Sequence, residues 1–238
     1  MRGALWFYMS ASELISIIQT LYGELRTSFS GDAGEASARK RAEKLTYTPS
    51  VPRSRNKARG DYRDKVHNML LRTEELEDRP AISKLVARAF ADQAKGGEPG
   101  EVALLEQLYA CDEYIQQFSV VALVEDQIVG HVIATRGWLD GDVPLLGLGP
   151  IAVDPEFQGK GIGGALLNEI RDRAIAAGER GIILLGHTTY YPRFGYVPAI
   201  PAGIIPSDVS WGDHFMALQL GDKELPQGKF IYAAPFGV

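Results

Sequence analysis

A glycine-rich segment between a predicted strand and a predicted helix is the strongest constraint on how this chain folds. The segment runs from Asp154 to Ala165, reads DPEFQGKGIGGA, and holds four glycines within Gly159–Gly164. The apolar run Val143–Val153 before it predicts a strand, and the amphipathic run Ile162–Ala177 after it predicts a helix ending at Gly178. Glycines let backbone N–H groups approach a ligand, and a helix N-terminus favours negative charge. The segment therefore predicts an anion site, most often for phosphate, and not merely a glycine turn.

Two common phosphate loops share this composition, but neither fits the context. Gly159–Gly164 matches the dinucleotide fingerprint G-x-G-x-x-G letter by letter. In that motif the strand runs almost directly into the first glycine, whereas Asp154–Gln158 intervene here, and the next strand ends at Gly186-His187 without the acidic residue that binds ribose. A P-loop needs Ser or Thr after its lysine, and Lys160 is followed by glycine.

The order of predicted elements from Met69 onward indicates an α/β domain with a mixed sheet. Two of the strands form a hairpin whose turn we expect at Asp126-Gln127, and Tyr190–Phe194 is at most a helical turn. Helices are predicted from Asp78 to Phe90, from Pro99 to about Cys111, and at Ile162–Ala177. Strands are predicted at Met69–Thr73, Gln117–Glu125, Ile128–Trp138, Val143–Val153 and Gly181–Leu185, with weaker ones at Phe215–Leu220 and Phe230–Ala233.

Three motifs together resemble a known family. Gln158–Gly163 satisfies the signature [Q/R]-x-x-G-x-[G/A], the strand before it contains LGPIAV from Leu148, and YYPRFGY spans Tyr190–Tyr196. In these motifs and in element order, residues 69–238 resemble the GNAT superfamily of N-acetyltransferases. The likeness is strongest to a bacterial subfamily of predicted acetyltransferases with largely unassigned substrates. It implies one α/β domain of the α+β type, whose mixed, mostly antiparallel sheet is splayed between its fourth and fifth strands and flanked by helices.

The resemblance also implies acetyl-CoA as co-substrate and assigns its contacts. Loop amides would hold the pyrophosphate, backbone groups of the fourth strand would bind the pantetheine arm, and Arg193 could touch a phosphate. The residues concerned are Ile151, Ala152, Val153, Gln158, Gly159, Lys160, Gly161, Ile162, Gly163, Gly164, Tyr191 and Arg193. Pro150 agrees with an opening in the sheet because it has no N–H for an uninterrupted central strand, although a simple bulge would also accommodate it.

The chemistry expected of such an enzyme requires few side chains. A neutral amine attacks the thioester, a backbone N–H stabilises the oxyanion, and an acid protonates the leaving thiolate. The family motif places that acid at Tyr191, which could otherwise be a packed aromatic; Tyr190 should point elsewhere and form packing or the cleft wall. The fourth strand carries no Glu or His, so His187 is the first candidate base. His131, Glu125 and a water chain are the alternatives.

The formal net charge of −5 hides a strong asymmetry. Residues 1–68 hold 12 Lys and Arg against 7 Asp and Glu, whereas residues 69–238 hold 13 against 23. Residues 1–25 have helix-like apolar spacing, while residues 30–65 are polar with few large aliphatics. We therefore expect residues 1–68 to be a basic, largely disordered extension, or an over-extended start, and residues 69–238 to be the catalytic domain. No nucleic-acid motif accompanies the basic residues, so no nucleic-acid partner is expected.

Other features narrow the class of protein. The single cysteine, Cys111, rules out an internal disulfide framework and fits a reducing compartment, so we expect a cytoplasmic protein. The longest charge-free run, Phe194–Ser207, is shorter than the roughly 18 residues of a spanning helix, so no membrane partner is expected. The four histidines lack metal-ligand spacing, so no metal is expected.

We expect the acceptor to be a small-molecule amine, with a protein amine as the alternative. The segments Trp138–Val143 and Ala199–Trp211 are mostly apolar and could form the acceptor cleft, which suggests a small or partly apolar amine. The expected chain is a monomer or homodimer. The competing hypothesis from another class is a non-catalytic acyl-CoA-binding or sensory module on the same fold, followed by a nucleotide-binding oxidoreductase.

Overall fold

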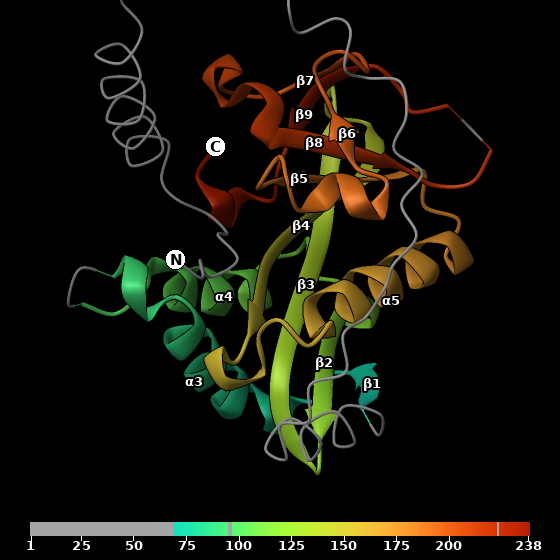
Figure 1. The fold of residues 1–238 in the computed structure, drawn as a ribbon. Coiled ribbons are helices and arrows are strands. Elements are labelled where there is room, and N and C mark those ends of the chain that lie inside the picture. Colours follow the sequence, from blue (N-terminus) through green and yellow to red (C-terminus); the bar gives the residue numbers. More distant parts are fainter. Residues whose placement is uncertain (1–68, 95–96, 223) are drawn as a thin grey trace, which may run out of the picture. The chain divides into compact units, whose positions relative to one another are not determined.

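A computed structural model describes residues 69–238, apart from residues 95–96 and 223 (Figure 1). The predictions for residues 1–68, both the helix-like pattern and the disordered linker, lie outside the described residues. All elements below belong to the described part.

One mixed sheet organises the domain. Its strands run in the order β1-β2-β3-β4-β5-β8-β6, and neighbours are antiparallel except β4 and β5, which are parallel. Strand β9 pairs with the far end of β3, and β7 runs parallel to β9. The strands are β1 (Leu70–Thr73), β2 (Ser119–Val124), β3 (Gln127–Leu139), β4 (Val143–Val153), β5 (Gly181–Leu185), β6 (Val197–Pro198), β7 (Ile204–Ile205), β8 (Phe215–Gln219) and β9 (Gly228–Ile231). The predicted mixed, mostly antiparallel sheet is confirmed.

Helices cover both faces of this sheet (Figure 1). Helices α3 (Arg79–Ala89) and α4 (Gly100–Ala110) lie on one face, and α5 (Ile162–Ala176) lies on the other. Helix α5 approaches β3 so closely at Gly130 that an added Cβ would lie 2.9 Å from Ile162. The three predicted helices are therefore present, within one or two residues of the expected ends.

The ends of α5 follow from its sequence. Gly178 has a φ of +76°, and its N–H donates to the carbonyl of Ile175 while that of Glu179 donates to Ala174. These two bonds satisfy carbonyls that the last helical turn would otherwise leave open. The predicted glycine stop therefore has the expected geometry.

Three local predictions differ from the structure. Strand β9 (Gly228–Ile231) begins and ends two residues before the predicted Phe230–Ala233. The β2–β3 turn lies at Glu125-Asp126, one residue before the expected Asp126-Gln127, and both turn residues have positive φ angles, +50° and +62°. Strands β6 and β7 were not predicted, because two-residue strands carry no periodic signal and are defined only by their partners.

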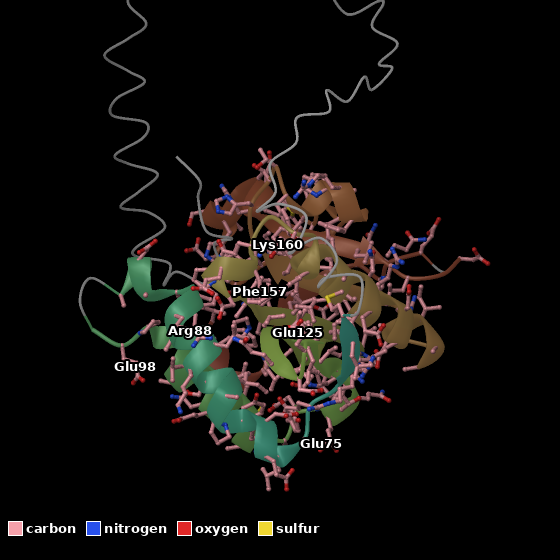
Figure 2. All side chains as sticks on the ribbon, turned by 60° about the horizontal axis from the view of Figure 1, so that its bottom comes forward. Glu75, Arg88, Glu98, Glu125, Phe157 and Lys160 are labelled. Atoms are coloured by element: carbon pink, nitrogen blue, oxygen red, sulfur yellow. The ribbon has the colours of Figure 1, made fainter. Side chains whose placement is uncertain are left out.

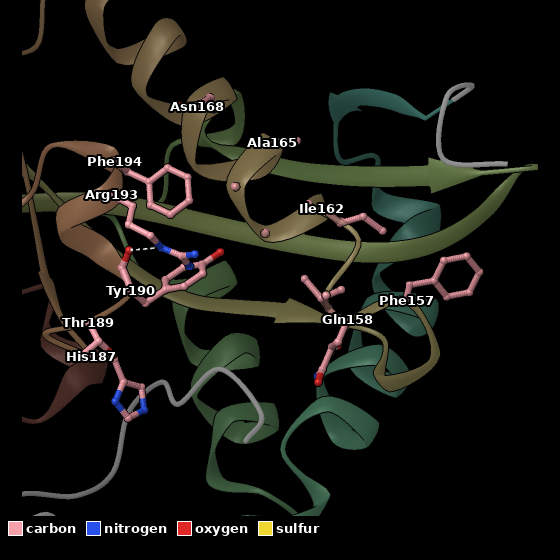
Figure 3. Close-up of a pocket in the computed structure, with 15 residues that line it drawn as sticks. Phe157, Gln158, Ile162, Ala165, Asn168, His187, Thr189, Tyr190, Arg193 and Phe194 are labelled. Atoms are coloured by element: carbon pink, nitrogen blue, oxygen red, sulfur yellow. Dashed lines mark hydrogen bonds between the residues drawn. The ribbon is translucent and has the colours of Figure 1, made fainter. Parts of the chain in front are cut away.

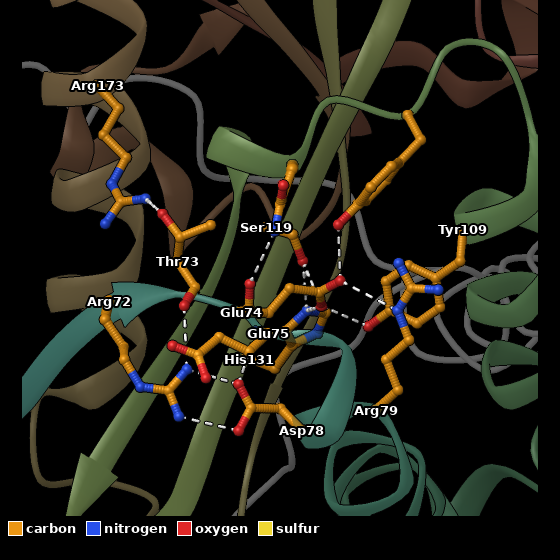
Figure 4. A network of polar contacts seen from close by, with 12 residues as sticks. Arg72, Thr73, Glu74, Glu75, Asp78, Arg79, Tyr109, Ser119, His131 and Arg173 are labelled. Atoms are coloured by element: carbon orange, nitrogen blue, oxygen red, sulfur yellow. Dashed lines mark hydrogen bonds and ion pairs between the residues drawn. The ribbon is translucent and has the colours of Figure 1, made fainter.

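A buried polar cluster connects β1 to β2, β3 and the end of α4 (Figure 4). Its centre is the carboxylate of Glu74, which is 1% exposed. The hydroxyl groups of Tyr109, Tyr114 and Ser119 each donate to it at 2.7 Å. The Nε2 atom of His131 lies 2.9 Å from the Ser119 hydroxyl and 3.4 Å from the carboxylate. The cluster therefore ties segments far apart in the sequence to one buried charge.

Candidate active site

The sheet opens between β4 and β5. The two strands pair only at Leu146 with Ile182 and at Gly147 with Ile183, whereas β5 continues to pair with β8 up to Leu185. Beyond Gly147, therefore, no described strand pairs with the β5-facing edge of β4. The predicted splay is confirmed, and it leaves backbone groups of Leu148–Val153 available along one side.

The break in β4 also appears on its other side. Val132 of β3 pairs with Ile151 and Ala134 pairs with Leu148, so Ile133 alone faces both Gly149 and Pro150. The Gly149–Pro150 peptide bond is cis. The bulge and the opening that we considered as alternatives at Pro150 therefore occur together, one toward β3 and the other toward β5.

The glycine-rich loop follows the open end of β4. It begins with a short helical turn, η5 (Pro155–Phe157), and the Gln158 side-chain amide donates to the carbonyl of Val153 at 3.1 Å. Gly161 starts α5 with a φ of +91°, a conformation that glycine adopts readily. The first helical bond runs from the Ala165 N–H to the Gly161 carbonyl, so the N–H groups of Ile162–Gly164 are left for another acceptor.

An ion pair ties the start of the loop to the opposite face of the sheet. The guanidinium of Arg88, on α3, binds the carboxylate of Asp154 at 2.5 Å. The other oxygen of that carboxylate accepts a bond of 3.0 Å from the Glu156 N–H. Figure 2 shows Arg88 on the same side of the molecule as Phe157 and Lys160 of the loop. Arg88 therefore helps to fix where the loop leaves the sheet.

A large cavity lies against this loop (Figure 3). We call it the glycine-loop cavity; its volume is about 940 Å³. Arg193 lies across Tyr190 on one wall, its guanidinium carbon 4.5 Å from the ring centre, and none of the described lining residues is acidic. The lining residues are Val153, Phe157, Gln158, Gly159, Gly161, Ile162, Gly163, Gly164, Ala165, Asn168, His187, Thr189, Tyr190, Arg193 and Phe194. The cavity therefore combines free amides, a helix N-terminus and one cation.

Most of the site residues named from the sequence come together here. Val153, Gln158, Gly159, Gly161, Ile162, Gly163, Gly164, His187 and Arg193 line the cavity, whereas Ile151, Ala152, Lys160 and Tyr191 do not. Ile151 and Ala152 lie in the open part of β4, before Val153. The Lys160 ammonium instead donates to the Glu156 carbonyl at 2.7 Å and lies over the Phe157 ring.

Tyr191, the first residue of η6 (Tyr191–Phe194), and Tyr190, which precedes it, occupy different environments. Tyr191 is 1% exposed, and its ring packs so closely on Gly186 that a Cβ there would lie 2.3 Å from Cε2. Tyr190 is half-buried and lines the cavity, and the two rings lie at 90°. Burial raises the pKa of both hydroxyls above the ordinary value of 10. Both therefore keep their protons at neutral pH.

The three candidate bases lie in three different places. His187 lines the cavity just after β5, and burial, together with the charge of His214, lowers its pKa below the ordinary value of 6.5. His131 belongs to the buried Glu74 cluster, and Glu125 lies in the β2–β3 turn. Of the three, only His187 lines the glycine-loop cavity.

Sequence reasoning missed several lining residues. Phe157, Ala165, Asn168, Thr189 and Phe194 were not assigned to the site. Asn168 could have been found, because it lies four residues after Gly164 and so on the same helix face. Phe157 and Ala165 belong to the turn and the helix on either side of the glycines, and nothing in their residue types marks them as lining residues. Thr189 and Phe194 give no comparable signal, since their place depends on how the η6 segment folds back over α5.

No set of three or more His, Cys, Asp or Glu side chains is arranged to hold a metal ion within residues 69–238 as far as they are described. No helix in the same part of the chain has the length and apolar character needed to cross a membrane.

The fold and the loop define the class of protein. A mixed sheet that opens beside a glycine-rich loop, with the amides of a helix N-terminus directed at a cavity, is the architecture of an acyltransferase. A family model described as "Acetyltransferase (GNAT) domain" matches residues 116–198, which contain β2 to β5, the loop and η6. The chain belongs to the GNAT family of N-acetyltransferases, as the sequence resemblance predicted.

The relatives in sequence have no assigned substrate. The chain is 34% identical over 136 residues to the uncharacterized N-acetyltransferase YjhQ of Escherichia coli K12, covering 56% of this chain and 72% of YjhQ. It is 30% identical over 129 residues to the uncharacterized N-acetyltransferase YhbS of the same strain, covering 54% and 73%. These matches show the family to which the chain belongs, and they do not identify its amine acceptor.

Solved structures agree with the fold. A GNAT family acetyltransferase from Brucella melitensis, crystallised with acetyl-CoA, is 31% identical and superposes with a TM-score of 0.58 over 71% of this chain and 99% of its own. YhbS from Escherichia coli, crystallised with CoA, is 24% identical with a TM-score of 0.63 over 71% and 92%. At 24% identity, the likeness to YhbS supports the fold alone.

Proposed function

We propose that this chain transfers the acetyl group of acetyl-CoA to a primary amine by direct attack. The observation that carries the proposal is the glycine-loop cavity, which joins free helix-terminal amides to the unpaired edge of β4. The Brucella relative, which was crystallised with acetyl-CoA, supports the same donor here. No described acidic residue lines the cavity, in keeping with a ligand that carries several phosphates.

In this proposal the backbone makes most of the donor contacts. The amides from Gln158 to Gly164, including that of Lys160, surround the pyrophosphate, and the Arg193 guanidinium pairs with a phosphate. The pantetheine arm lies along β4 and bonds backbone groups of Ile151, Ala152 and Val153, where β5 no longer pairs. The lysine side chain itself turns back to Glu156 and contributes only its amide.

The transfer requires one bond to form and one to break. The amine nitrogen attacks the thioester carbon, the carbon–sulfur bond breaks, and the thiolate takes a proton from Tyr191. The nitrogen loses its extra proton to His187 or to solvent. The depressed pKa of His187 keeps that imidazole neutral and able to accept a proton at pH 7. The Tyr191 ring lies against Gly186, at the end of β5 where the sheet opens.

Two matched glycine variants test the donor site. Gly161→Asp should weaken acetyl-CoA binding about 100-fold or more, since like charges about 4 Å apart near a surface repel by up to about 4 kcal/mol. Gly141→Asp is the control: its φ of +90° matches the +91° of Gly161, and neither glycine has an atom within 4 Å of an added Cβ. Calorimetric titration with acetyl-CoA is the measurement. Equal affinity of the two variants would refute the phosphate cradle.

A pair of tyrosine variants tests the acid. Tyr191→Phe should lower kcat about 100-fold with little change in acetyl-CoA affinity, the effect expected of a lost general acid. Tyr190→Phe should change kcat less than threefold while affecting acetyl-CoA binding, because Tyr190 lines the cavity wall. Thiol release over an amine panel is the assay. The reverse pattern would move the acid to Tyr190, and acetyl-CoA binding without turnover would favour a non-catalytic acyl-CoA-binding module.

The catalytic domain in this proposal is residues 69–238. Every residue named in the site lies within it. A truncated chain starting at Met69 should therefore keep the kcat and acetyl-CoA affinity of the full chain within about twofold. Loss of activity in a truncated chain that still unfolds cooperatively would show that residues 1–68 take part.

A further inference from the structure

A second, smaller cavity lies where β4 and β5 separate. We call it the aromatic cavity. Leu148 and Pro150 of β4 and Leu185 of β5 form one side, and the rings of Trp211, Tyr232 and Phe236 form the other. Trp211 lies in the segment that the sequence suggested for the acceptor, whereas Trp138, in the other suggested segment, pairs with β9 and lines neither described cavity.

The position of this cavity relates it to the donor site. Leu148 precedes Val153, which lines the glycine-loop cavity, by five residues of β4. A regular strand of that length spans about 16 Å at 3.2–3.4 Å per residue, and the bulge at Gly149–Pro150 makes the separation shorter than that. Leu185 likewise precedes His187 on the other side of the opening. If the donor follows β4 as proposed above, its phosphates lie at one end of this stretch. Its acyl end then lies at the other, beside the aromatic cavity. The inference therefore rests on the proposed function.

The chemistry of the lining limits what can enter. The described lining residues include no charged side chain, so a second ammonium or a carboxylate would be buried without a partner. The rings of Tyr232 and Phe236 are close to each other, with a centroid separation of 5.0 Å. Trp211 is held from behind by Phe215, which does not line the cavity, at a centroid separation of 5.8 Å. Such a wall favours a flat apolar group.

The indole N–H of Trp211 indicates one hydrogen-bonding group that the ligand should carry. Trp211 is 3% exposed, and its indole N–H has no hydrogen-bond partner among the described residues. A buried donor without a partner costs free energy, so a ligand oxygen that accepts this bond would gain affinity. The cavity is narrow, about 10 Å³, which is room for a single water molecule. Entry of a larger group therefore requires the surrounding side chains to turn.

We propose that the aromatic cavity is the acceptor site, and that the acceptor is a primary amine on an apolar, preferably aromatic, skeleton. The amine carries no second charge, and a carbonyl or hydroxyl oxygen near its ring accepts the Trp211 N–H. The amine nitrogen faces the opening between β4 and β5, where the thioester carbon arrives.

An amine panel tests the class of acceptor. Thiol release from acetyl-CoA is followed with the full chain and phenylalanine amide, 2-phenylethylamine, 1,4-diaminobutane or a lysine-containing peptide. The two aromatic amines should give kcat/KM at least tenfold above the other two. Faster turnover of the diamine or the peptide would overturn the aromatic acceptor and leave the proposed function standing. Binding of acetyl-CoA with no turnover of any amine would overturn both.

Matched variants locate the site. Trp211→Phe keeps a ring but removes the N–H, and should raise KM for phenylalanine amide about fivefold with KM for acetyl-CoA unchanged. Trp138→Phe is the control and should leave both constants unchanged. Val238→Glu places a carboxylate at a rim residue that is 36% exposed, and should raise kcat/KM for 1,4-diaminobutane severalfold. Unchanged acceptor constants in both Trp211→Phe and Val238→Glu would place the acceptor elsewhere.

Discussion

Glu74→Gln should lower the free energy of unfolding by about 3 kcal/mol at pH 7, and the loss should shrink as the pH falls. Burial alone would raise the pKa of the Glu74 carboxyl, but hydrogen bonds from His131, Tyr109, Tyr114 and Ser119 outweigh burial and lower it from 4.5 to about 2. At about 1.4 kcal/mol per pKa unit, that difference corresponds to about 3 kcal/mol in favour of the folded, ionised state.

The sign of the pH dependence follows from the direction of the shift. Because the folded pKa lies below the unfolded value, the contribution is fully present above pH 4.5 or so and declines as the pH falls toward 2. Glutamine cannot ionise, so the variant lacks this contribution at every pH. Its single side-chain oxygen also cannot serve all three hydroxyl donors that the carboxylate accepts.

Urea unfolding followed by tryptophan fluorescence at pH 7, 5, 4 and 3.5 measures the difference directly. The gap between wild type and Glu74→Gln should be about 3 kcal/mol at pH 7 and visibly smaller at pH 3.5. Glu77→Gln, at an exposed acid three residues away, should stay within about 0.5 kcal/mol of wild type throughout. A gap below 1 kcal/mol at pH 7, or one that does not change with pH, would refute the reasoning.

Three further predictions concern the site. Gly186→Ala should lower kcat about tenfold and reduce stability by about 1–3 kcal/mol, because the new Cβ would lie 2.3 Å from the Tyr191 ring; unchanged kinetics and melting temperature would contradict this packing. Arg88→Gln should raise KM for acetyl-CoA about threefold at constant kcat, since Arg88 holds Asp154 at the start of the loop. Arg88→Lys should bring KM part of the way back toward the wild-type value. An equal loss in kcat would argue against a positioning role. With His187 as base, kcat at saturating amine should rise with pH to a plateau through a midpoint below 6.5, because burial and His214 favour the neutral ring and the base must be neutral. His187→Gln should remove that limb, and its persistence would exclude His187.

Much of this fold could be predicted from the sequence, because long elements carry their own signals. Helix α5 has an apolar face and a glycine stop at Gly178, and β4 is an apolar run bounded by the turn before it and Asp154 after it. The opening of the sheet was signalled by Pro150, which cannot donate to a neighbouring strand. Each of these features is local, and a few consecutive residues specify it.

Features that depend on distant partners were beyond the sequence. The carboxylate of Glu74 meets Ser119 and His131, 45 and 57 residues further along the chain, and no local pattern links them. Helical geometry could indicate that Tyr190 and Tyr191 point in different directions. It could not indicate which of them would line the cavity, because that depends on where η6 packs against Gly186.

Both cavities lie along β4 and the end of β5, but different later segments close them. The family-model match ends at Pro198 and contains the glycine loop, whereas the aromatic rings that close the smaller cavity come from residues 211–236. With the acceptor in the aromatic cavity, as proposed above, substitutions in that later stretch would change the accepted amine without disturbing the donor loop. Descendants of one gene could then diversify in what they acetylate while keeping the same donor.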